Sequence, residues 1–90
     1  MSRLDGKVLV ITGSTQGVGE GIALQAARNG AEGIVICGRN EEAGRKVAAA
    51  VEEIGAASLF VEVDLHDVEA TRNVLAACDE KFGRVDGLVN

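Results

Sequence analysis

Short apolar runs alternate with stretches of helical periodicity along this chain, and this alternation constrains the fold more than any other feature. Three runs rich in Val, Ile, Leu and Phe cover residues 7–12, 33–37 and 58–63, and a fourth covers residues 85–90. Their near-continuous apolarity is typical of strands that are covered on both faces, as in a parallel sheet.

Between these runs, hydrophobic residues recur at the spacing of a helix with one buried face, and a glycine that can end a helix follows each stretch. The expected stripes and stops are Val18, Ile22 and Ala26 before Gly30, then Ala43, Val47, Val51 and Ile54 before Gly55, then Val68, Thr71, Leu75, Cys78 and Phe82 before Gly83. The order of elements predicts an α/β fold with right-handed crossovers onto a doubly wound parallel sheet.

Size and charge exclude several classes of function. With 90 residues and 47% apolar content, the chain is large enough for one core and too small for two, so we expect a single domain over residues 1–90. It has neither a bilayer-length apolar run nor the pattern of a signal peptide, which predicts a cytoplasmic protein. Its net charge of −5 argues against a surface for nucleic acid or for anionic membranes.

The two cysteines and the single histidine give little support for a metal site. Cys37 and Cys78 lie far apart among apolar neighbours, which predicts two reduced, buried thiols rather than a disulfide. Without a Cys-x-x-Cys pair, a zinc or iron–sulfur site has almost no ligands, and we expect no bound metal. His66 fits a loop or the start of a helix better than a catalytic role.

Glycines cluster in residues 11–21, which read ITGSTQGVGEG. Each glycine weakens the interior of a helix or strand by about 0.5–1 kcal/mol, so the cluster needs a reason. It falls at the first strand-to-helix turn, where a doubly wound sheet binds ligands, and there it would let backbone N–H groups and a helix N-terminus approach a pyrophosphate. The alternative is a turn whose glycines only relieve crowding. A P-loop is excluded because the Gly-Lys-Ser/Thr ending is missing.

The pattern Thr12-Gly13-x-x-x-Gly17-x-Gly19 resembles the glycine motif of the short-chain dehydrogenases/reductases. Further matches fall in register at Gly38-Arg39-Asn40, at Asp64-Leu65, and at Leu88-Val89-Asn90, which resembles the opening of the Asn-Asn-Ala-Gly motif. The resemblance covers the whole chain. It implies a Rossmann-like sheet that is truncated after its fourth strand, and a nicotinamide dinucleotide as cofactor.

The resemblance also implies a role for each matched position. Asp64 would accept the adenine amino group, with a simple cap or turn before the third helix as the alternative. Asn90 would contact the adenosine ribose and tie down the central strands. The implied cofactor-binding residues are Gly13, Ser14, Gln16, Gly17, Val18, Gly19, Arg39, Asp64, Leu65 and Asn90.

Arg39 bears on the choice of cofactor. An acid about 20 residues after the glycine motif would bind the 2′-hydroxyl of NAD, whereas an arginine accommodates the 2′-phosphate of NADP. Gly38 stands where NAD-preferring relatives usually have the acid, so we expect a preference for NADP(H), with NAD as the alternative cofactor. Many NADP-preferring members have Lys or Arg where this chain has Gln16, and Arg39 could instead be a solvated surface residue.

The resemblance places the catalytic serine, tyrosine and lysine of the family beyond residue 90, and this chain contains no tyrosine. We therefore expect no catalytic residue here and interpret the chain as the N-terminal part of a longer dehydrogenase. The fourth strand would then have an unpaired edge, and part of the third helix, including Val74 and Ala77, would lose its cover. Self-association through either surface, or marginal stability, is the expected result.

Two alternatives keep the same fold. One is a stand-alone nucleotide-binding or regulatory module, and the other is an assembly module that no longer binds a nucleotide. A methyltransferase is disfavoured, because those Rossmann-like proteins usually have an acid where Arg39 stands.

Overall fold

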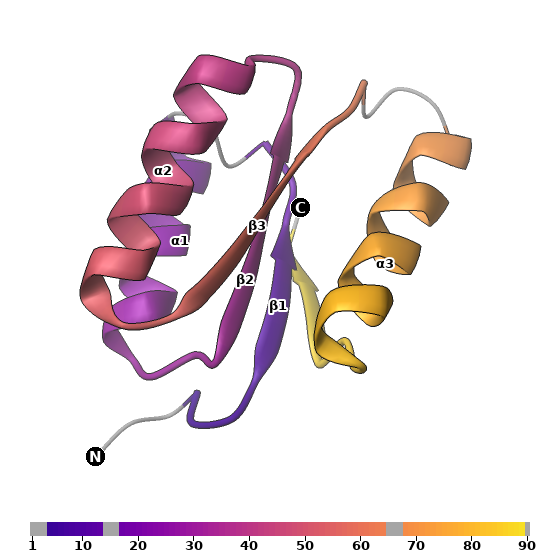
Figure 1. Cartoon of the computed structure of the whole chain (residues 1–90). Coiled ribbons are helices and arrows are strands. Elements are labelled where there is room, and N and C mark those ends of the chain that lie inside the picture. Colours follow the sequence, from indigo (N-terminus) through magenta and orange to yellow (C-terminus); the bar gives the residue numbers. More distant parts are fainter. Residues whose placement is uncertain (1–3, 14–16, 65–67, 90) are drawn as a thin grey trace.

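The computed structural model describes residues 4–13, 17–64 and 68–89, and four parallel strands form one sheet in this part of the chain. The sheet order is β3-β2-β1-β4 (Figure 1). The elements are, in chain order, β1 (Val8–Ile11), α1 (Gly17–Arg28), β2 (Gly33–Gly38), α2 (Glu41–Ile54), β3 (Ala57–Glu62), α3 (Val68–Phe82) and β4 (Gly87–Val89). The predicted α/β fold with a Rossmann-like, doubly wound parallel sheet is confirmed.

Helices cover both faces of the sheet. Helices α1 and α2 lie on one face and α3 lies on the other (Figure 1). Every residue of β2 is buried, which matches the apolar run expected for a central strand. The core has two parts, one on each face of the sheet. Between the sheet and helices α1 and α2 it includes Ile11, Ile34, Ile36, Val47 and Val51. Between the sheet and α3 it consists of Val8, Val10, Val35, Cys37, Val74 and Cys78. Both cysteines are buried and free, as predicted.

The helices end where the glycines predict, because Gly30, Gly55 and Gly83 all adopt positive φ just after α1, α2 and α3. At the start of α2, the side chain of Asn40 accepts a hydrogen bond of 3.0 Å from the N–H of Ala43. Asn40 is therefore the N-cap of this helix, and it fixes the path of the chain between β2 and α2.

The buried face of α1 differs from the predicted stripe. Val18 is 81% exposed and Ile22 is 37% exposed, whereas Ala23, Ala26 and Ala27 are buried. A stripe that steps by four residues drifts around a helix of 3.6 residues per turn, so only its last member, Ala26, lies on the buried face. Small side chains at this face let α1 pack closely on the sheet.

The expectation that Val74 would lose its cover was wrong. Val74 is 1% exposed and packs from α3 against Val8, Val10 and Val35 of the sheet, and Ala77 is half-buried. The α3 face that carries Val74 therefore rests on the sheet of this chain. Strand β4 is an outer strand of the sheet, and its Leu88 is 43% exposed. Self-association through β4 or α3 stays a prediction.

Asp86 joins the start of the central strand β1 to the start of the outer strand β4. Its Oδ2 accepts a hydrogen bond of 2.7 Å from the N–H of Val8, and its Oδ1 accepts one of 2.7 Å from Nη2 of Arg84. Its own N–H donates to the carbonyl of Val8 at 2.8 Å. The hydrogen bond from Arg84, followed by the one from Val8, holds the pKa of Asp86 below its usual value. The ionised carboxylate is therefore the form that stabilises this junction.

The lowered pKa predicts a pH-dependent effect of the Asp86→Asn substitution. A carboxyl with a depressed folded-state pKa adds stability above its unfolded pKa of about 3.9, and this stability is lost as the pH falls through the folded value. The variant should melt below the wild type at neutral pH, and the difference should shrink below about pH 4. Melting curves across this range test it, with exposed Asp79→Asn as the control. A difference that stayed constant with pH would contradict this role of the carboxylate.

Candidate functional site

The parallel sheet places most of the predicted site residues at its carboxyl edge, the side of the sheet where all the strands end. Because all strands run in the same direction, the residues that follow them meet at the carboxyl edge of the sheet. Gly13 follows β1, Arg39 follows β2 and Asp64 follows β3. Four predicted site residues, Ser14, Gln16, Leu65 and Asn90, lie outside the described residues.

The turn between β1 and α1 requires its glycines. Gly13 has φ 61° and Gly17 has φ 62°, a region that residues with a side chain rarely adopt. A Cβ at either position would meet no described atom within 4 Å, so the space beside the backbone is open. Helix α1 begins at Gly17, and exposed Val18 and half-buried Gly19 lie in its first turn. The N-terminus of α1 and an accessible backbone therefore occur at the same place, an arrangement that suits a phosphate group.

Thr12 connects this turn to the end of β4. Its N–H and its Oγ1 both donate to the carbonyl of Val89, at 2.9 and 3.1 Å. This pair of bonds holds the residue before Asn90 beside the glycine turn. Thr12 opens the Thr-Gly motif in the sequence, but its bond to Val89 joins positions far apart in the chain and was not predicted.

Arg39 lies between the end of β2 and the N-cap Asn40, so both neighbouring elements restrict its backbone. Its side chain is exposed at the carboxyl edge. Among the residues that the structure describes, none of the ion pairs involves Arg39. The guanidinium can therefore reach an anion beside the sheet.

Asp64 follows β3, the neighbour of β2 in the sheet, and is exposed at the same carboxyl edge. The N–H of Val63 donates to the carbonyl of Gly38 at 2.9 Å, which ties the segment after β3 to the end of β2. Residues 65–67, between Asp64 and α3, lie outside the described residues. A cap or turn before the third helix therefore stays the alternative for Asp64.

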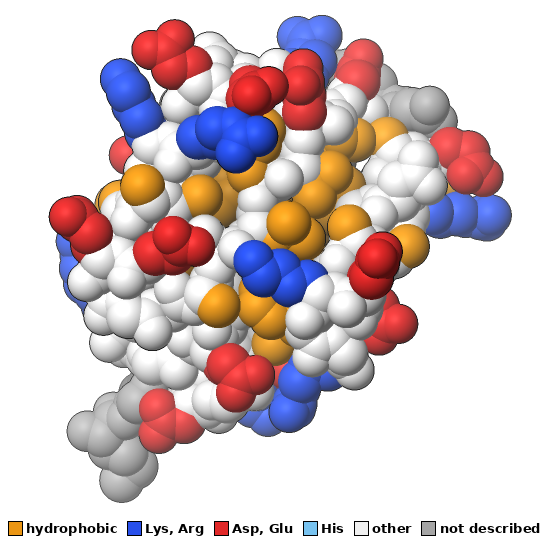
Figure 2. Space-filling view, in the orientation of Figure 1, with side chains coloured by type: hydrophobic (Ala, Val, Ile, Leu, Met, Phe, Trp, Pro, Cys, Tyr) orange, Lys and Arg blue, Asp and Glu red, His pale blue; other side chains and the backbone are white. Residues whose placement is uncertain are grey.

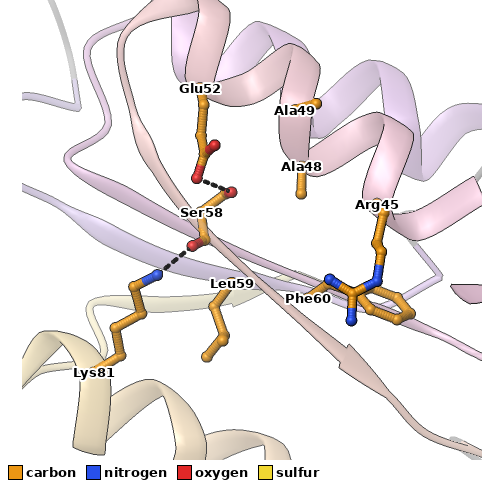
Figure 3. A pocket seen from close by; sticks show the side chains of 8 residues that line it. All are labelled: Arg45, Ala48, Ala49, Glu52, Ser58, Leu59, Phe60 and Lys81. Atoms are coloured by element: carbon orange, nitrogen blue, oxygen red, sulfur yellow. Dashed lines mark hydrogen bonds between the residues drawn. The ribbon is translucent and has the colours of Figure 1, made fainter.

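A surface cavity of about 440 Å³ lies elsewhere, beside the amino-terminal half of β3 (Figure 3). Lys81 donates from Nζ to the carbonyl of Ser58 at 2.6 Å, and Oγ of Ser58 donates to Oε2 of Glu52 at 2.8 Å. The guanidinium of Arg45 stands 5.9 Å from the ring centroid of Phe60. The lining residues are Arg45, Ala48, Ala49, Glu52, Ser58, Leu59, Phe60 and Lys81.

The charged side chains at this cavity lie along an edge strand of the sheet. Strand β3 is the outer strand of the sheet, and a lysine on such an edge disfavours pairing with another chain. Figure 2 shows hydrophobic side chains along the surface between α2 and α3, with charged groups around them. The strand residues that line the cavity precede the carboxyl end of β3, and neither Gly13 nor Arg39 is among the lining residues.

Two further observations concern the described residues only. No group of three or more His, Cys, Asp and Glu side chains there could hold a metal ion. No helix in these ranges has the length and apolarity needed to span a membrane.

Comparison with known proteins identifies the family. Residues 7–90 match the short chain dehydrogenase family. The chain is 41% identical over 90 residues to a 3beta-hydroxysteroid dehydrogenase of Mediterraneibacter gnavus, covering all of this chain and 32% of the relative. It is 34% identical over 84 residues to versicolorin reductase 1 of Aspergillus parasiticus, covering 93% of this chain and 32% of that protein. The chain thus spans about a third of the length of these curated relatives.

Solved structures of dehydrogenases are similar to this chain. A hydroxysteroid dehydrogenase from Escherichia coli superposes with a TM-score of 0.91 at 32% identity, covering 98% of this chain and 37% of that one. An NAD+-bound xylitol dehydrogenase gives a TM-score of 0.90 at 30% identity, covering 97% and 33%. The family uses NAD(P) as its cofactor. The chain belongs to the short-chain dehydrogenases, and it matches their cofactor-binding part.

Proposed function

We propose that this chain is the NADP(H)-preferring, cofactor-binding part of a cytoplasmic short-chain oxidoreductase, and that it does not turn over substrate alone. The observation that carries the proposal is the glycine turn after β1, which lies at the same sheet edge as Arg39 after β2. The turn fits a pyrophosphate, and a guanidinium one strand away fits a 2′-phosphate.

In this proposal each part of the carboxyl edge binds one part of the dinucleotide. Backbone N–H groups around Gly13 and Gly17 and the N-terminus of α1 bind the phosphates. Arg39 binds the 2′-phosphate through paired charged hydrogen bonds, and Asp64 accepts the adenine amino group. The bound cofactor would supply or accept a hydride. The resemblance to the family implies a tyrosine as the proton donor, and these 90 residues contain none.

A non-catalytic module with the same fold is the second candidate. Exposed Val85 just before β4 and exposed Leu88 within β4 favour an assembly function, because this outer strand can pair with another chain. A chain that is folded but binds neither NADPH nor NADH would favour this candidate over the first.

The Arg39→Ala substitution tests the cofactor preference. Loss of hydrogen bonds to a charged group corresponds to about a 10- to 100-fold rise in the Kd for NADPH. The Kd for NADH, which has no 2′-phosphate, should change little. Titrations can follow nicotinamide fluorescence, since the chain has no tryptophan or tyrosine to interfere.

Arg28→Ala is the matched control for this experiment. Arg28 is also exposed, but it ends α1 and so lies at the opposite edge of the sheet. This variant should keep the wild-type Kd for both nucleotides. Wild-type binding of NADH that equals or exceeds that of NADPH would overturn the proposed preference.

A further inference from the structure

The two segments that the proposed function requires leave the sheet side by side. Strands β1 and β2 are paired in parallel, with Ile11 opposite Ile36. Ile11 ends β1 and leads through Thr12 into the glycine turn, and Cys37 precedes Gly38 at the end of β2. The relative position of these two strand ends therefore sets the distance between the turn and Arg39.

Cys37 bridges these two strand ends with its side chain. Its Sγ lies 3.3 Å from the carbonyl oxygen of Ile11, the distance of a thiol-to-carbonyl hydrogen bond. The residue is fully buried and packs with Val10, Val35 and Val74, so the core restricts the position of the thiol. Burial raises the pKa of Cys37 to about 11, and the group is therefore a protonated donor at neutral pH.

We propose that Cys37 is a positioning residue for NADP(H): its buried contact with the Ile11 carbonyl holds the glycine turn and Arg39 at the spacing that one dinucleotide requires. The inference rests on the proposed function. It assigns a binding role to a core side chain that never touches the cofactor. NADPH should depend on this spacing more than NADH, because only NADPH must contact the turn and Arg39 at the same time.

Cys78 offers a matched control within the same core. It is also fully buried, belongs to the same hydrophobic cluster, and has its Sγ 3.5 Å from a backbone carbonyl, that of Arg84. That carbonyl precedes β4, so the contact lies at the amino edge of the sheet, away from the proposed site. Replacing Cys78 should affect stability as replacing Cys37 does, without affecting the spacing.

The experiment compares Cys37→Ala, Cys37→Ser and Cys78→Ala with the wild type, using fluorescence titrations with NADPH and NADH and circular dichroism to verify folding. Cys37→Ala should raise the Kd for NADPH about threefold and the Kd for NADH less, so that the NADPH preference falls. Cys37→Ser keeps a donor at this position and should restore most of the preference. Cys78→Ala should leave the preference unchanged.

Several outcomes would overturn the inference while leaving the proposed function intact. One is an unchanged NADPH preference in Cys37→Ala. Another is an equal change in Cys37→Ala and Cys78→Ala, which would indicate a general effect of core packing. A third is unfolding of both Cys37 variants while Cys78→Ala stays folded. If the folded wild type and Cys78→Ala bind neither nucleotide, the proposed function itself fails, and the inference fails with it.

Discussion

A Gly17→Val variant is expected to bind NADPH at least about 100-fold more weakly than the wild type. Gly17 has φ 62°, and a β-branched residue in this region carries strain of about 1–3 kcal/mol. The new side chain would also enter the open space beside the backbone, which is where we propose that a phosphate lies. Loss of one charged hydrogen bond adds about 1.5–3 kcal/mol. Together these losses amount to about 2.5–6 kcal/mol, compared with roughly 2.8 kcal/mol for a 100-fold change in Kd.

Gly21→Val is the matched control for this prediction. Gly21 also lies in α1 and is exposed, and a Cβ there would meet no described atom within 4 Å. Its φ is not positive, so valine fits the helix at this position. Fluorescence titration should give a Kd within about twofold of the wild type, since about 0.4 kcal/mol corresponds to a factor of two. Equal binding by the wild type and a folded Gly17→Val variant would contradict the proposed phosphate site.

The second large effect is expected for stability, in a Gly44→Val variant. Gly44 lies in α2 directly against the ring of Phe60 in β3, and a Cβ at this position would overlap the ring. Either the ring or the helix must move, and overpacking of this kind costs about 1–3 kcal/mol. For a domain of this size the melting temperature should fall by about 5–20 °C.

A second substitution separates this clash from a general effect of valine in a helix. Phe60→Ala removes the ring, so the double variant should recover part of the loss caused by Gly44→Val. Gly21→Val is again the control, because it introduces the same side chain where nothing is in contact. Thermal melts of the wild type, Gly44→Val, Phe60→Ala and the double variant give the coupling between positions 44 and 60. If Gly44→Val and Gly21→Val melted alike, the packing of Phe60 on Gly44 would be refuted.

The parts of the fold that follow from local pattern were predictable. Each strand and helix arises from a short run of residues with one periodicity, and Gly30 and Gly55 end their helices where the pattern predicts. The carboxyl edge follows from the same alternation, because parallel strands must expose their following residues at one side. The glycine turn was placed at this edge from the alternation, whereas Arg39 and Asp64 were proposed as cofactor-binding residues from the resemblance to the family.

The parts that depend on contacts between distant residues were not predictable. The two phenylalanines each rest on a glycine, Phe60 on Gly44 and Phe82 on Gly33, and nothing in the spacing of these residues indicates it. The bond of Asp86 to the N–H of Val8 joins the two ends of the chain. Such contacts depend on how the elements pack, which periodicity does not specify.

Amide NMR spectra of the chain during titration with NADPH test most directly whether the carboxyl edge of the sheet binds the cofactor. We expect saturable shifts concentrated at Gly13, Gly17 and Arg39, with little change at Ser58 and Lys81 beside the cavity of β3. Shifts concentrated at that cavity, or no shifts in a chain whose spectrum is that of a folded protein, would contradict it.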